Sequence, residues 1–107
     1  MIINGREVKF LYTIGAYCDL NDYVVAHQEV SAMTANIHKA VFMNAAYNEA
    51  HGVDPKETIT VEELKALPAY EVVELMKEVN AAEEAGSKRT VEAEEKKPKK
   101  AEARKSN

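Results

Sequence analysis

The chain has 107 residues, enough for one domain, and its hydrophobic fraction of 46% is ordinary for a folded protein. The net charge of −4 hides an asymmetry: residues 1–86 carry 6 Lys and Arg against 14 Asp and Glu, a net charge of −8, whereas residues 87–107 carry 8 against 4, a net charge of +4. The acidic balance argues against nucleic-acid binding by the folded part, because phosphate contacts need positive surface.

Cysteine content and hydropathy indicate the cellular compartment in which the protein acts. Cys18 is the single cysteine, so no disulfide can form within the chain, which suits a reducing cytoplasm. The opening MIINGREVKF has no apolar run of signal-peptide length, and no stretch approaches the roughly 20 apolar residues of a membrane span. We therefore expect a soluble protein of the cytoplasm with no membrane partner.

Residues 1–12 have the pattern of a β-hairpin. Asn4-Gly5 is the strongest short signal for a type I′ turn, because both central residues of that turn have positive φ. Beyond the turn, side chains alternate along the second strand. The alternation predicts that Val8, Phe10 and Tyr12 face the core.

A helix is predicted over residues 14–28, with Thr13 as its N-cap. Asp19 and Asp22 are neighbours on one side of it, and without a third ligand nearby in sequence they indicate a solvated acidic face and no metal site. Cys18 is expected to be a small buried hydrophobe. We expect it to belong to a wide apolar stripe that faces the core: Ile14, Tyr17, Cys18, Leu20, Val24 and Val25.

Residues 31–51 carry the longest helical signal in the chain and are expected to form its central element. Ser31 or Thr34 can cap this helix, and Gly52 can take the left-handed turn that ends it. Asn44 interrupts the apolar stripe, so either its amide is buried with hydrogen-bond partners or the buried side is rotated towards Met43. The stripe predicted to be buried comprises Met33, Ile37, Ala40, Val41 and Tyr47.

The opposite side of this central helix carries Phe42 among Ala35, Ala46 and Ala50. Either another helix of the same chain covers this side, or it is free to meet a partner. In the second case Phe42 is expected to anchor self-association and client binding.

The rest of the folded part is expected to hold two helices. The segment 60–63 (TVEE) fits a capping box for a short helix lined by Val61, Leu64 and Leu67, which Pro68 ends. A second helix is predicted over residues 69–85, closed by Gly86, with four residues on its buried side: Val72, Leu75, Met76 and Val79.

From Ser87 onward the apolar periodicity disappears, so we expect a disordered charged tail over residues 87–107. Residues 1–86 then form a single folded domain. The predicted class is mainly α (α+β), with an N-terminal β-hairpin followed by a bundle of three to four helices.

No residue pattern in the chain indicates catalysis or a cofactor. The spacings of His27, His38 and His51 match no zinc motif, and the four glycines are scattered, so there is no phosphate-binding loop. We expect no catalytic, cofactor-binding or metal site, and hence a protein that is not an enzyme.

Three segments carry a family resemblance: IINGREVKFLYTIGAYCDLND, then ITVEELKALPAYEVVELMKEV, then the short Lys- and Glu-rich tail. Together they resemble the small tail assembly chaperones of long-tailed (siphovirus-like) bacteriophages, particularly those of Gram-positive hosts. The most specific pieces are ING-x-E-x-K-F running into TIGA, and TVEEL-x-x-LP. The resemblance implies a small acidic helical adaptor that coats the tape measure protein, helps recruit tail tube protein in the host cytoplasm, and leaves before the virion matures.

Partner-binding residues are not identified by the family's motifs, so we take them from the aromatic residues of the chain, because a helical client needs apolar helical faces to bind. The candidates are Phe42, Tyr47, Tyr23 and Tyr70; for each, the alternative is an ordinary core or scattered surface aromatic. The expected partners are tape measure protein, tail tube protein and further copies of the chain. Two other functions stay open: a nucleic-acid-associated phage or plasmid factor acting through the basic tail, and a minor structural tail subunit.

Overall fold

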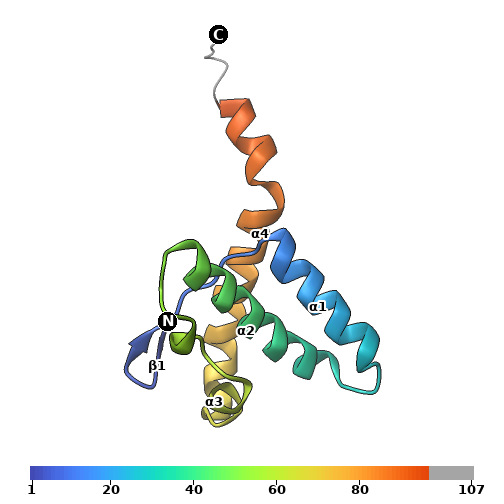
Figure 1. The fold of residues 1–107 in the computed structure, drawn as a ribbon, viewed down its shortest axis with the longest axis vertical. Helices are drawn as coiled ribbons and strands as arrows, with labels where there is room; N and C mark the ends of the chain where they lie inside the picture. Colours follow the sequence, from blue (N-terminus) through green and yellow to red (C-terminus); the bar gives the residue numbers. More distant parts are fainter. Residues whose placement is uncertain (97–107) are drawn as a thin grey trace.

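The computed structural model describes residues 1–96 (Figure 1). The predicted class is confirmed over this part of the chain, which holds a two-stranded hairpin and four α-helices. Short 3₁₀ helices at Pro55–Glu57 and Ala69–Glu71 lie before α3 and α4. The elements are β1 Ile2–Ile3, β2 Arg6–Glu7, α1 Ile14–Ala26, α2 Ala32–Ala50, α3 Val61–Lys65 and α4 Val72–Lys96.

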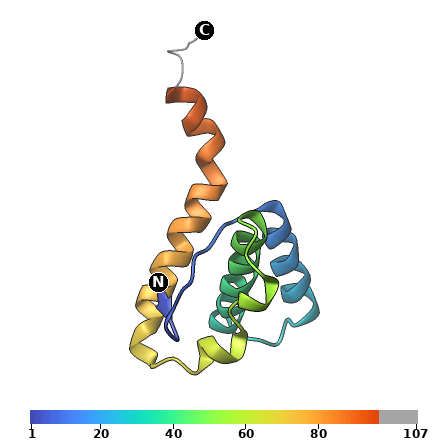
Figure 2. The ribbon, with the colours of Figure 1, turned by 60° about the vertical axis from the view of Figure 1, so that its left-hand side comes forward.

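Helix α2 is the central element, as predicted. α1 runs beside it in the opposite direction, and α4 crosses on its other side and continues beyond the body (Figure 1). Figure 2 shows the chain from the hairpin to α1 passing between α4 and α2. The core therefore lies between α2 and the layer formed by this segment, α3 and the first half of α4.

The hairpin is shorter than predicted. Asn4 and Gly5 have φ of 54° and 77°, as the type I′ turn requires, but the strands pair only Ile2 with Glu7 and Ile3 with Arg6. The predicted second strand through residue 12 was wrong, because this stretch leaves the hairpin and runs against helices. Its inward side chains still follow the alternation: Val8 is buried, and Phe10 and Tyr12 are half-buried against the core.

Asn44 fixes this extended segment to the core. Its Nδ2 donates to the carbonyl of Lys9 at 2.8 Å, and its Oδ1 accepts from the backbone amide of Ile59 at 2.8 Å. The carbonyl of Met43, the residue before Asn44, accepts from the amide of Leu11 at 3.0 Å. Both alternatives drawn from the sequence therefore hold, since Asn44 is buried with partners and Met43 is buried beside it.

Helix α2 begins and ends as predicted, with Ser31 accepting from the amide of Thr34 at 3.1 Å and Gly52 at φ 68°. Ile37 and Ala40 are buried, but Met33 is 45% exposed, so its predicted burial was wrong. The buried side is completed by residues further along the helix: Met43, Asn44 and Asn48.

Helix α1 is confirmed as a helix, with the Thr13 hydroxyl accepting from the amide of Ala16 at 3.1 Å. Its predicted orientation was wrong. Ala16 is the only buried residue of the helix, and the stripe expected to face the core is largely exposed, with Ile14 at 83% and Val25 at 70%. Cys18, expected to be buried, is exposed as well. Asp19 and Asp22 are exposed as predicted.

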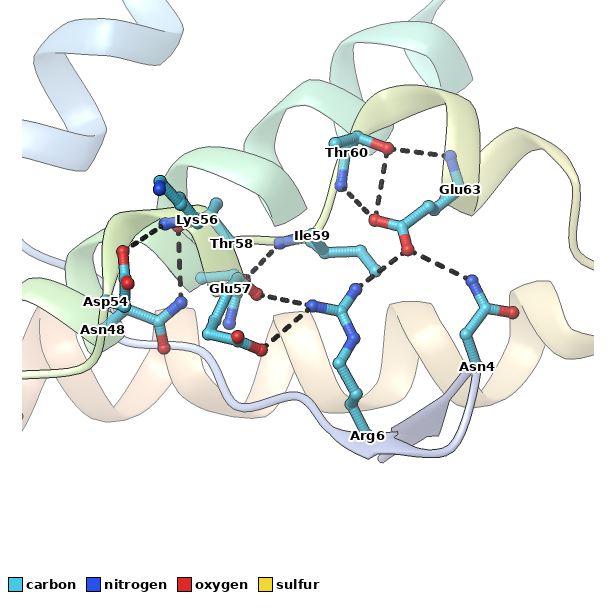
Figure 3. Close-up of polar contacts among 11 residues, drawn as sticks. Asn4, Arg6, Asn48, Asp54, Lys56, Glu57, Thr58, Ile59, Thr60 and Glu63 are labelled. Atoms are coloured by element: carbon cyan, nitrogen blue, oxygen red, sulfur yellow. Dashed lines mark hydrogen bonds and ion pairs between the residues drawn. The ribbon is translucent and has the colours of Figure 1, made fainter.

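A polar cluster joins the hairpin to α3 (Figure 3). The guanidinium of Arg6 pairs with Glu63 at 2.9 Å and donates to the carbonyl of Glu57 at 2.9 Å, while Asn4 donates to Glu63 at 3.2 Å. Glu63 also completes the predicted capping box with Thr60, which is confirmed. The hydrogen bond from the Thr60 amide, then Asn4 and Arg6, lower the pKa of Glu63, with partial burial opposing them.

Helix α4 extends further than predicted. It continues through Gly86 to Lys96, so the expected helix end at Gly86 was wrong. Gly86 allows α4 to pack closely against Tyr12, because a Cβ at this position would lie 2.6 Å from the carbonyl oxygen of Tyr12 and 2.9 Å from its Cβ. Of the tail predicted to be disordered, residues 87–107, the structure places 87–96 in this helix, and 97–107 lie outside the described residues.

Candidate partner-binding surfaces

A groove at one corner of the body is the first candidate surface. It has a volume of about 320 Å³ and lies between the start of α2, α3 and the start of α4. We call it the corner groove; Glu71 is the one charged residue among those that line it in the described part of the chain. Its apolar lining includes Met33, Ile37, Leu64, Leu67, Pro68 and Val72.

The local sequence explains why the corner is left open. Pro68 has no amide to continue α3, so the chain leaves the helix and turns through Ala69–Glu71 before α4 begins. α3 has only five residues and cannot cover the first turns of α2. The buried Ile37 and Leu64 therefore form a floor, and the partly exposed Met33 and Leu67 form the edge.

Tyr70 is a neighbour of the corner groove in the chain. It lies between two residues that line the groove, Ala69 and Glu71, and is 77% exposed. Val73, three residues further on, is also exposed. Tyr70 and Val73 are therefore exposed apolar residues that follow the groove closely in sequence.

The second candidate surface is the side of α1 that points away from α2. Ala16 packs against the core cluster, and the ring of Tyr23 stacks on His38 of α2 at 3.8 Å, so one side of α1 is covered. The opposite side carries exposed residues at spacings of three and four along the helix. We call it the outer face; it consists of Ile14, Tyr17, Cys18, Asn21, Val24 and Val25.

Three of the four predicted binding residues lie in contacts within the chain. Tyr23 is stacked between His27 and His38, at ring distances of 4.3 and 3.8 Å. Phe42 is half-buried, one turn after His38 on the side of α2 that α1 covers. Of the two alternatives for that side, the structure shows the first, coverage by a helix of the same chain.

Tyr47 and Tyr70 lie elsewhere and apart from this cluster. Tyr47 is half-buried, stacks on His51 at 4.0 Å and lies in a cleft with Phe10 between the N-terminal segment and α4. Tyr70 alone among the four is largely exposed and adjoins a groove. The structure thus brings Tyr23 and Phe42 together and leaves Tyr47 and Tyr70 separate.

Sequence reasoning missed the outer face and Met33, because it assigned both to the core. A signal was present in α1: its apolar residues extend around more of the helix than one neighbour can cover. Ile14 and Val25 lie on the side opposite Ala16 and Leu20, so two separate contacts are needed to bury them all.

His38 of α2 lies in the contact with α1, stacked on Tyr23. Burial in that contact lowers its pKa, and the charges of Lys65 and His27 lower it further, while Glu62 opposes them. Among residues 1–96 no group of three His, Cys, Asp or Glu side chains is placed to share a metal ion. The described helices include none long and apolar enough to cross a membrane.

The fold and these surfaces define a small, mainly α protein that offers apolar contact area on an acidic body. A scan against protein-family models finds no match for the chain, and searches of curated proteins and of solved structures find none either.

Proposed function

We propose that the protein is a phage tail assembly chaperone that binds the tape measure protein through the corner groove and helps recruit tail tube protein. It acts in the host cytoplasm by binding, without catalysis, and leaves before the virion matures. The observation that supports this function is an open apolar groove on a small acidic helical body. The sequence resemblance of residues 1–86 supports it independently.

The shape and lining of the corner groove suit a helical client. Amphipathic helices bind apolar grooves through anchors at i, i+3 or i+4 and i+7, and a cavity of about 320 Å³ has room for one such anchor group. Met33 gives the edge a flexible side chain that adapts to different anchors along a long client. Glu71 at the lining and the net charge of −8 over residues 1–86 keep a chaperone with exposed apolar area soluble.

Co-expression with the tape measure protein of the same phage tests this function. The full chain should hold the tape measure protein in the soluble fraction and co-purify with it. Met33→Glu should weaken capture roughly tenfold or more, because it places a carboxylate at the apolar edge of the groove. Tyr70→Ala should weaken it less, since Tyr70 is next to residues that line the groove but does not line it itself.

Val25→Glu is the matched control, because it adds the same charge at an exposed apolar residue of the outer face. It should leave capture unchanged. Circular dichroism should show equal helix content for all variants. A wild-type chain that captures no tape measure protein, or equal capture by the wild type and Met33→Glu, would overturn the proposal.

A further inference from the structure

We propose that the outer face of α1 joins two copies of this chain side by side, with their α1 helices parallel around a two-fold axis. The inference uses a different surface from the corner groove and does not depend on the proposed function. It rests on the spacing of the outer face, on Asn21 at its centre and on the charges beside it.

The spacing of the outer face is that of a two-helix seam. Ile14, Tyr17, Asn21 and Val24 follow one another at intervals of three, four and three, which is the a and d pattern of paired helices. Cys18 and Val25 widen the seam on one side. None of these residues is charged, and an uncharged centre containing an aromatic residue is typical of interface cores.

Asn21 favours a second copy of this chain as the partner that covers the outer face. Within the described residues its exposed side chain has no hydrogen-bond partner. An amide both donates and accepts, so two identical amides meeting at a two-fold axis satisfy each other. Asn at an a position has this role in parallel helix pairs, where it fixes register and the two-stranded state. An apolar client helix would instead bury the amide without a partner, which is costly.

The charges on α1 select the parallel arrangement. Asp22 lies to one side of the outer face, and the helix has no Lys or Arg to neutralise it. In an antiparallel pair the two-fold axis would bring the Asp22 sides of both copies to the same edge of the seam, where like charges repel. In a parallel pair the two Asp22 residues lie at opposite edges.

The size of the seam sets the strength of the association. A helix of 13 residues is about 20 Å long, so its contact is smaller than the roughly 800 Å² per partner of a standard stable interface. We therefore expect a reversible dimer, whose population rises with concentration across the micromolar range and above.

Sedimentation velocity of the full chain over a concentration series tests the dimer. The wild type should shift from monomer to dimer, and Val25→Glu should raise the dissociation constant at least about tenfold by burying an unpaired carboxylate. Met33→Glu, in the corner groove, should dimerise like the wild type. A wild type that is monomeric throughout the series would overturn the dimer while leaving capture by the groove untouched.

Disulfide trapping tests the parallel arrangement. With Cys18 replaced, Cys18→Ser/Ile14→Cys should form an intermolecular disulfide on mild oxidation, because residue 14 of each copy meets its counterpart at the axis. Cys18→Ser/Glu49→Cys, with the cysteine at an exposed position of α2, is the control and should stay unlinked. A dimer that Ile14→Cys fails to trap would overturn the parallel seam, and loss of tape measure capture by Val25→Glu would assign the outer face to the client instead.

Discussion

Helices α1 and α2 are neighbours with similar N-caps but opposite relations to the core. The Thr13 and Ser31 hydroxyls each accept a hydrogen bond from the backbone amide three residues further on, so both helices begin with the same kind of N-cap. α2 then buries five residues and α1 buries one, Ala16. The difference lies in their surroundings, since α2 is enclosed by α1 on one side and by α3, α4 and the N-terminal segment on the other.

This comparison shows that an apolar stripe on a helix identifies surface that needs a packing partner. It does not show that the partner belongs to the same chain. The buried side of α2 is met by segments far away in sequence, for example where Asn44 donates to the carbonyl of Lys9 at 2.8 Å. On the outer face of α1, the ring of Tyr17 meets that of Tyr12 edge to face at 6.2 Å, while Ile14 and Val25 stay 83% and 70% exposed. The contrast is what links the fold to function, because the face left open is available for association.

The largest expected effect is on the free energy of unfolding, where the two helices should differ because only α2 is packed in the core. Met43→Ala on α2 should lower the free energy of unfolding by about 2–5 kcal/mol, since Met43 is fully buried and truncation leaves a cavity. Val25→Ala on α1 should change it by less than about 0.5 kcal/mol at concentrations where the chain is monomeric. Urea unfolding of both variants measures the difference. Equal losses would show that α1 is buried in solution and would remove the contrast.

A second comparison uses the asparagines of the two helices. Asn44→Leu should cost about 1–3 kcal/mol for each of the two backbone groups that it leaves buried and unpaired, at Lys9 and Ile59. Asn21→Leu, on the exposed side of α1, should leave monomer stability almost unchanged. Hydrogen exchange at the Ile59 amide gives a local readout, and we expect its protection to fall only in the first variant. Unchanged protection there would contradict the role assigned to Asn44.

The features predictable from sequence are those decided within a few residues. The Asn4-Gly5 turn and the capping box of Thr60 and Glu63 each satisfy their own backbone groups locally, so the sequence predicts them correctly. The orientation of α1 depends on which of its sides α2 meets, and no local rule decides that. The corner groove is partly predictable, because Pro68 marks the end of α3, but the position of Met33 beside it is a tertiary fact.

The two helical glycines extend the comparison to α4. Gly86→Ala should destabilise the fold by about 1–3 kcal/mol, because the new Cβ would overlap the backbone of Tyr12. Gly15→Ala in α1 should stabilise it by up to about 1 kcal/mol, since its Cβ would find only the Thr13 hydroxyl at 3.7 Å and alanine favours helix. Thermal unfolding should therefore shift in opposite directions for the same substitution. A stabilising Gly86→Ala would show that α4 does not approach Tyr12 closely.

The smallest expected effect concerns the contact that joins α1 to α2, the stack of Tyr23 on His38. Because the pKa of His38 is lowered in the folded state, the unfolded chain binds its proton first as the pH falls below the ordinary value of 6.5. Stability should therefore be greatest above pH 6.5 and decline as the pH falls from there to the folded-state pKa. His38→Gln should flatten this part of the stability profile, whereas His51→Gln, which alters a stack within α2 alone, should not. Urea unfolding from pH 7.5 to 5 compares the three proteins. A wild-type profile that rises with acidity over this range would reverse the sign and show that protonated His38 is the form that holds α1 against α2.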